Sequence, residues 1–153
     1  MNLWAKFDEE SGRHHLLIHH LADVAAVTEA LLILPLWRKR LARLAGAMNL
    51  SSISISRLCF FSALHDLGKC NSGFQKKIRG KGSGGHVGVC GYLFDDQIRD
   101  RALKALMFER WAGWCEKPEK AAQILLAAIS HHGRPIDRPI RSNLRDWLAG
   151  EPD

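Results

Sequence analysis

Apolar residues recur at helical spacing along most of the chain. Between Leu16 and Leu34 they return at the intervals of a single helical face, which is typical of a helix that buries one side. Pro35 ends this helix and can occupy the first turn of a second helix, which we expect to reach Ala47. The hydrophobic pattern therefore predicts two consecutive helices joined at a proline.

A third helix is expected to begin near Ser54 or Ser56, because either hydroxyl can cap the first turn of a helix. Its apolar residues continue to about Leu67, where Gly68 would end it. The segment from Gly68 to Gly85 is rich in glycine and in basic residues. This segment is therefore expected to be the least helical part of the chain.

The remaining apolar stretches predict further helices. A short one covers about His86 to Phe94, and a longer one covers about Gln97 to Trp114. Pro118 would open a helix from Glu119 to about Ser130, and a last short helix would include Leu144 to Leu148. Strand signals are few. The sequence therefore predicts a single all-α domain of five to seven helices over residues 1–153.

The composition is that of a globular domain with a modest excess of positive charge. The chain has 22 Lys and Arg against 16 Asp and Glu, a formal net charge of +6, which is compatible with a polyanionic partner. No apolar run approaches the roughly 18 residues that span a bilayer, and the first residues lack the features of a signal peptide. We therefore expect a cytoplasmic protein without membrane contact. The four cysteines form no close pairs, which predicts free thiols.

The histidines are the most informative residues. Those that fall within or at the ends of apolar helices are His20, His65, His86, His131 and His132. Neutral imidazole is a good ligand for transition metals, and the carboxylate of Asp66, which follows His65, can bridge two metal ions. The set therefore predicts a metal site, although each histidine alone could be a hydrogen-bonded core residue. His19 is the main alternative to His20, which lies closer to the apolar face.

The segment LHDLGK at residues 64–69 resembles the signature of the HD superfamily of metal-dependent phosphohydrolases. Further segments narrow this resemblance to one family within the superfamily. They are LWAK at residues 3–6, HLADVA at 20–25, FQ at 74–75 and HHGRP at 131–135. Together with His86, they are similar to the HD nuclease domain of type I CRISPR interference, which is fused to a helicase or works with one. The resemblance covers about residues 3 to 135 and implies an HD helical bundle.

The resemblance also implies the ligands of one or two divalent metal ions. His20, His65 and Asp66 would bind the first ion, and Asp66 would bridge to a second ion held also by His86, His131 and His132. The ions implied are Mn, Co, Ni, Fe, Mg or Zn, because histidine-rich sites accept several metals.

Two further roles concern residues close to these ligands. The resemblance implies that Lys69 and Asp66 are catalytic and that Lys69 lies near the scissile phosphate. The simpler alternative is that Lys69 is only a cation placed where the C-terminal end of a helix favours positive charge. Asp23, on the same helix face as His20, could hydrogen-bond a ligand imidazole. The family carries one more metal-binding aspartate on a late helix. Asp146 is the candidate substitute, and the alternative is a C-terminally shortened form that lacks this ligand.

The implied function is divalent-metal-dependent cleavage of single-stranded DNA in CRISPR interference. The implied partners are a helicase and the CRISPR RNA-guided surveillance complex. Two alternatives stay open: a phosphohydrolase of nucleotides or cyclic nucleotides, and a non-catalytic module that binds nucleic acid or a helicase. The basic segment formed by Lys76, Lys77, Arg79 and Lys81 could contact a phosphate backbone or be a solvated linker.

Overall fold

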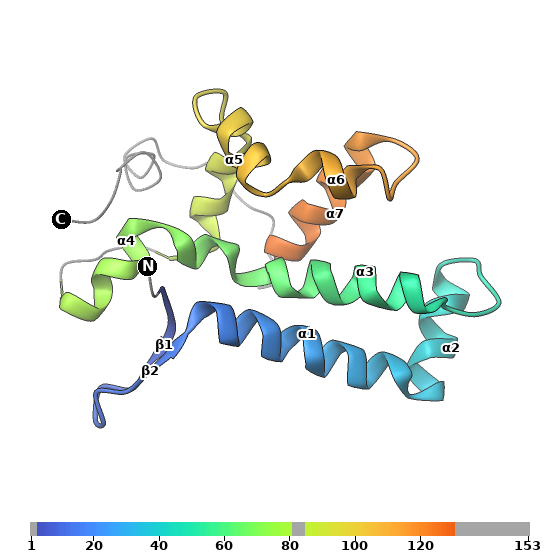
Figure 1. Ribbon diagram of the computed structural model, residues 1–153, viewed down its shortest axis with the longest axis horizontal. Coiled ribbons are helices and arrows are strands. Elements are labelled where there is room, and N and C mark those ends of the chain that lie inside the picture. The colour runs from blue at the N-terminus through green and yellow to red at the C-terminus, as the bar shows by residue number, and fades with distance from the viewer. Residues whose placement is uncertain (1–2, 81–84, 131–153) are drawn as a thin grey trace.

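A computed structural model describes residues 3–80 and 85–130 (Figure 1). The chain opens with a short antiparallel hairpin of β1 (Trp4–Phe7) and β2 (His14–Leu16). Gly12, with a φ of 67°, supplies the left-handed conformation that its turn requires. The sequence analysis predicts no strand here, because three or four residues are too few to establish an alternating pattern.

Three longer helices follow the hairpin. α1 (Leu17–Ile33) and α3 (Ser52–Ala63) lie side by side in opposite directions (Figure 1). α2 (Pro35–Leu44) turns away from α1 with a bend of 90°. The proline junction is therefore confirmed, although α2 ends before Ala47. No single helix in the described residues is long and apolar enough to span a membrane; α1 and α2 reach that composition only when counted together across their bend.

The beginning and the end of α3 both differ from the prediction. Its cap is Ser51, whose hydroxyl accepts a hydrogen bond from the backbone N–H of Ser54 at 3.0 Å. The α-helix ends at Ala63, and the chain then tightens into the 3-10 helix η1 (Leu64–Cys70). The sequence does not distinguish the two helix types, because both continue the same apolar face.

The second half of the domain consists of helices of four to seven residues and of α7, which has 12 residues. They are α4 (Ser72–Gln75), η2 (Lys76–Arg79), η3 (Gly88–Phe94), α5 (Arg99–Ala105), α6 (Phe108–Ala112) and α7 (Pro118–Ile129). The prediction of one helix from Gln97 to Trp114 is wrong, because Met107 adopts a left-handed conformation with a φ of 50° and separates α5 from α6. The helix after Pro118 is confirmed.

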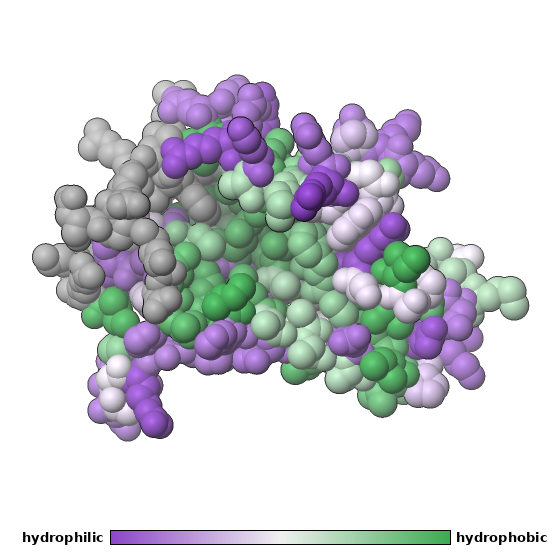
Figure 2. Space-filling view, viewed as in Figure 1, coloured by the Kyte–Doolittle hydropathy of each residue, from purple (hydrophilic) through white to green (hydrophobic). Residues whose placement is uncertain are grey.

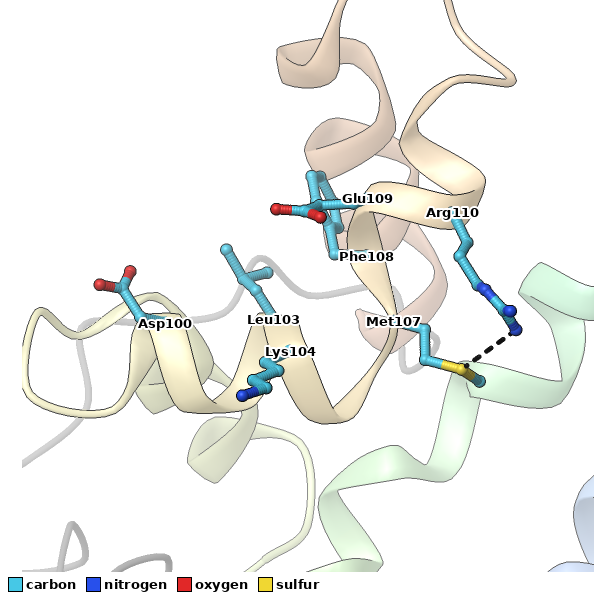
Figure 3. A pocket seen from close by; sticks show the side chains of 7 residues that line it. All are labelled: Asp100, Leu103, Lys104, Met107, Phe108, Glu109 and Arg110. Carbon is cyan, nitrogen blue, oxygen red and sulfur yellow. Dashed lines mark hydrogen bonds between the residues drawn. The ribbon is translucent and has the colours of Figure 1, made fainter.

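The break at Met107 produces an open hollow at the corner between α5 and α6. Charged side chains, including Lys104 and Glu109, and the apolar Leu103 and Phe108 line this hollow (Figure 3). Among the described residues, no histidine lines it. The residues that line the hollow therefore include none of the described candidate metal ligands.

The main core lies where α3, η1, η3, α6 and α7 meet. Its buried residues are Phe61, Cys90, Leu93, Trp111, Ala112, Ala121, Leu125 and Ile129. Trp111 is thus a core residue, whereas Trp114 is 36% exposed and lies at the edge. All four cysteines are free thiols, as predicted. The all-α fold is confirmed, and α7 packs directly against η1, the element that carries the HD segment.

Candidate metal centre

Asp66 lies at a kink inside η1 and is only 3% exposed. Its φ of −100° and ψ of 21° depart from helical values, so its carboxylate is directed differently from those of a regular helix. A buried carboxylate is costly unless several donors or cations surround it. The neighbouring side chains meet this requirement.

Three imidazoles and one ammonium group contact the two carboxylate oxygens. The Oδ2 atom lies 2.9 Å from Nε2 of His20, 3.1 Å from Nε2 of His65 and 2.7 Å from Nζ of Lys69. The Oδ1 atom lies 3.0 Å from Nε2 of His86. The structure therefore brings together five sequence-predicted residues from α1, η1 and the segment before η3.

Burial by itself would raise the pKa of the Asp66 carboxyl. Hydrogen bonds from His86 and Lys69, together with the positive charges of His65 and Lys69, more than offset burial and hold this pKa well below its usual range. The contacts therefore favour the anionic form of Asp66. An anionic carboxylate is the form that binds a metal ion.

The hydrogen bond of His65 fixes which of its nitrogens can bind a metal. Its Nδ1 lies 2.9 Å from the carbonyl oxygen of Ser62, and a carbonyl can only accept, so Nδ1 carries the proton. In the neutral ring, Nε2 then presents a lone pair toward Oδ2 of Asp66. Two lone pairs facing each other repel, and a cation between them would turn this repulsion into two favourable contacts.

His20, His65 and Asp66 form a donor set that fits such a cation. One ligand atom from each lies within 4.8 Å of the others. Burial lowers the pKa of His20, although Asp66 opposes this shift. A lower pKa keeps its ring neutral, as metal binding requires. The combination of imidazole nitrogens and a carboxylate oxygen suits first-row divalent metals.

The position of His86 depends on Gly68 and Cys90, two residues to which the sequence analysis assigns no role at the site. A Cβ atom on Gly68 would lie 1.6 Å from the carbonyl oxygen of His86. The thiol of Cys90, which also lies close to Gly68, donates a hydrogen bond to the same oxygen at 3.3 Å. Burial raises the pKa of Cys90 to about 12, so this thiol stays protonated. A glycine beside the HD pair is the only sequence signal for this close approach.

Gln75 connects the site to the N-terminal hairpin. Its Nε2 donates to the carbonyl oxygens of Lys69 at 2.6 Å and Trp4 at 2.9 Å. Its Oε1 accepts from the backbone N–H of Trp4 at 3.0 Å. The Trp4 ring also stacks on Phe74, with ring centroids 4.5 Å apart. The segments LWAK and FQ, noted only as part of the resemblance, are thus in contact with each other.

Other candidate residues lie outside this cluster. Asp23 pairs with His15 at 3.1 Å rather than with His20, so its expected hydrogen bond to a ligand imidazole is not formed. His19 is exposed, and the geometry places His20 at Asp66 instead.

The basic segment and the late ligands are described only in part. Lys76 and Lys77 are exposed in η2. The expectation that this segment is the least helical part of the chain is wrong as far as Arg79, because η1, α4 and η2 follow one another there. Lys81, the ligands expected at His131 and His132, and Asp146 lie outside the described residues. The expected helix at residues 144–148 also lies outside them.

Comparisons with known proteins bear on this arrangement. A family model described as the HD domain of Cas3 matches residues 4–151. The matched range contains every element of the described fold from β1 to α7 and every residue of the Asp66 cluster. Searches of curated proteins and of solved structures return no match.

Proposed function

The chain belongs to the Cas3 HD-domain family of metal-dependent CRISPR nucleases, and on this premise we propose that it cleaves single-stranded DNA at the Asp66 centre and works with a helicase. The observation that carries the proposal is the buried Asp66 carboxylate, whose two oxygens face three imidazole nitrogens and one ammonium group. This arrangement joins the donors of a metal site to a cation able to hold phosphate.

The residues that would hold metal follow from the contacts around Asp66. His20 and His65 would bind one ion through Nε2, together with Oδ2 of Asp66. His86 and Oδ1 of Asp66 would bind the second ion. When bound, a divalent ion lowers the pKa of a coordinated water and stabilises the charge that develops on a phosphodiester during hydrolysis. The hydrogen bond from His65 to Ser62 keeps Nε2 of that ring available throughout.

Lys69 would position the substrate phosphate beside these ligands. Its ammonium lies 2.7 Å from Asp66, and its side chain is 10% exposed. In such a partly buried position, a positive charge acts strongly on a phosphate oxygen because little water screens it. The backbone of Lys69 is in turn fixed by Gln75, so the ammonium is held close to the site where charge develops.

The shape around the centre favours a flexible strand as substrate. The side chains of His20, His65 and His86 are only 13%, 17% and 20% exposed, so a phosphodiester must bend inward to reach them. An open groove beside His20 runs along α1, with Lys6 on one side and Thr28 further along. A single strand can bend into such a site more easily than a stiff duplex.

The test is cleavage of labelled oligonucleotides by the purified chain with Mn²⁺, Co²⁺ or Ni²⁺. We expect single-stranded DNA to be cut and intact duplex to stay largely uncut until a helicase and ATP are supplied. A chelator, Asp66→Ala or His65→Ala should abolish cutting, whereas His19→Ala, on the exposed face of the same helix as His20, should retain it.

Three outcomes would contradict the proposal. Efficient cutting of blunt duplex by the chain alone would contradict the helicase requirement. Hydrolysis of nucleoside triphosphates or cyclic dinucleotides without DNA cleavage would assign a small-molecule substrate. Metal binding with neither activity would indicate a non-catalytic HD module.

A further inference from the structure

The end of the molecule where α1 meets α2 exposes a run of large apolar side chains. Ile33, Leu34, Leu36, Trp37 and Leu44 are exposed by 60%, 49%, 59%, 45% and 84%. We call these five residues, together with Lys39, Arg40 and Arg43, the corner surface. Figure 2 shows strongly hydrophobic and strongly hydrophilic residues side by side at this end of the molecule. Scattered exposed apolar residues are common, but a contiguous group marks an interaction site.

The cations of the corner surface have no acidic partner among the described residues. No Asp or Glu occurs between Glu29 and Asp66, and none of the described ion pairs includes Lys39, Arg40 or Arg43. Arg40 instead lies over the Trp37 ring, 5.8 Å from its centroid. These positive charges are therefore available to carboxylates on another molecule.

The order of residues along α2 indicates what kind of molecule that is. Leu36, Arg40 and Leu44 follow one another at intervals of one helical turn and share a face. A helix that lies on a membrane separates its charged face from its apolar face, and here the two are interleaved. Nucleic-acid interfaces are more polar than this surface, whereas the cores of protein interfaces are enriched in tryptophan and arginine.

We infer that the corner surface docks a protein partner whose facing surface carries carboxylates between apolar side chains. Residues 131–153 are a poor match for this occupant, because they contain four arginines and four acidic residues. A second copy is disfavoured by the net charge of +6, since like charges oppose association. The partner is therefore a different acidic protein surface.

The corner surface is firmly supported and lies away from the metal centre. Leu32, Ala42, Leu50 and Ile55 form a separate small core beneath it, and Arg38 donates to the carbonyl oxygen of Leu50 at 2.6 Å. At a rise of about 1.5 Å per residue, Ile33 lies about 20 Å along α1 from His20. A partner bound at the corner would thus leave the site at Asp66 accessible, and its binding does not depend on nuclease activity.

The probes for this inference are two synthetic helical peptides. In the first, Leu and Glu alternate on one face; in the second, Lys replaces every Glu. Fluorescence anisotropy with the intact chain should show that the acidic peptide binds and that the basic peptide binds at least about tenfold more weakly. Arg40→Glu with Arg43→Glu should reverse this preference, and Leu36→Ser with Trp37→Ser should weaken binding of the acidic peptide. Circular dichroism verifies that each variant is folded.

Lys117→Glu with Lys120→Glu is the matched control, because it changes the net charge equally on the exposed start of α7. It should leave the preference for the acidic peptide unchanged. An unchanged preference in the Arg40 and Arg43 variant would overturn the inference. The inference would also be overturned if the chain bound phosphatidylserine vesicles or a single-stranded oligonucleotide and the Leu36 and Trp37 variant lost that binding. Sedimentation that shows a dimer dissociated by Trp37→Ser would reassign the surface to a second copy.

Discussion

The carboxylate of Asp66 is stable in the interior because four side chains from different parts of the chain supply it with hydrogen bonds or positive charge. Of these contacts, the one to Lys69 is the shortest, at 2.7 Å, and the Lys69 ammonium acts on Asp66 both through this hydrogen bond and through its positive charge. Lys69 therefore balances the charge of Asp66 when no metal ion does so. The stability of the metal-free protein should therefore depend on Lys69, independently of catalysis.

Replacing Lys69 by methionine should destabilise the metal-free protein by about 3 kcal/mol, because it leaves a buried carboxylate without its charged partner. Urea unfolding in the presence of a chelator measures this loss. Added Mn²⁺ should stabilise Lys69→Met more than the wild type, since the ion replaces the missing charge. Lys104→Met, at an exposed position on α5, is the control and should change little. Equal stabilisation of both proteins by Mn²⁺ would show that Lys69 does not balance Asp66.

Gly68 leads to a second prediction, because a side chain there would collide with the backbone of His86. Gly68→Ala places a Cβ atom 1.6 Å from the carbonyl oxygen of His86 and 2.7 Å from the Sγ atom of Cys90, so His86 must move away from Asp66. Metal affinity, measured by isothermal titration calorimetry, should fall by about tenfold or more. The control Gly88→Ala meets no atom within 4 Å and should bind metal normally. Normal metal binding by Gly68→Ala would exclude His86 from the metal site.

The sequence predicts the residues that surround Asp66 better than those that position them. His20, His65 and His86 are visible because an imidazole in an apolar stretch requires an explanation. Cys90 acts through its thiol on a backbone carbonyl, and any small apolar residue would fit the same hydrophobic pattern. The pairing of Asp23 with His15 depends on the hairpin bringing β2 against α1, which sequence spacing within one helix does not reveal.

At the scale of the elements, η1 depends on α7 for its position. α7 contacts η1, α3 and α6, and its residues Ala121, Leu125 and Ile129 are fully buried. These residues recur at intervals of one helical turn, so a single stripe of α7 faces the core. The packing of this stripe supports the short 3-10 helix, whose hydrogen-bond geometry is poorer than that of an α-helix.

Shortening Leu125 should therefore weaken the fold strongly. Leu125→Ala removes a fully buried side chain from the main core, which costs about 2–5 kcal/mol for such a change. Leu126→Ala is the matched control on the same helix, because Leu126 is 37% exposed, and it should cost less than about 1 kcal/mol. Chemical unfolding monitored by circular dichroism measures both. Similar losses in the two variants would show that α7 is not anchored by this stripe.

The elements that the sequence predicts well are those with a long apolar face and a proline at their start. α2 and α7 fall into this group, and α1, which has no proline at its start, ends just before Pro35. The break at Met107 was not predictable, because a methionine in the left-handed region has no local sequence signature. Among the 3-10 helices, η3 falls within the short helix predicted at about His86–Phe94, whereas η1 was not distinguished from α3, whose apolar face it continues. η2 lies in the segment that was expected to be the least helical.

At the scale of the whole molecule, the first strand and the middle of the chain are joined at Gln75. The three hydrogen bonds of its side chain link β1 to α4 and to the backbone of Lys69. The Nε1 of Trp4 returns a further hydrogen bond to the backbone oxygen of Gln75 at 3.0 Å. Residues 71 positions apart in the sequence thus connect β1 to the backbone of Lys69, a connection that no local pattern predicts.

Replacing Gln75 by methionine should loosen this connection without changing the size of the side chain greatly. It removes three hydrogen bonds, each worth about 1 kcal/mol, so the free energy of unfolding should fall by about 3 kcal/mol. Hydrogen exchange should also rise at the backbone N–H of Trp4, which loses its acceptor in the variant. Gln97→Met, at an exposed position before α5, is the control and should change neither quantity. If Gln75→Met leaves exchange at Trp4 as slow as in the wild type, the hairpin is held by the stacking of Trp4 on Phe74 rather than by the amide of Gln75.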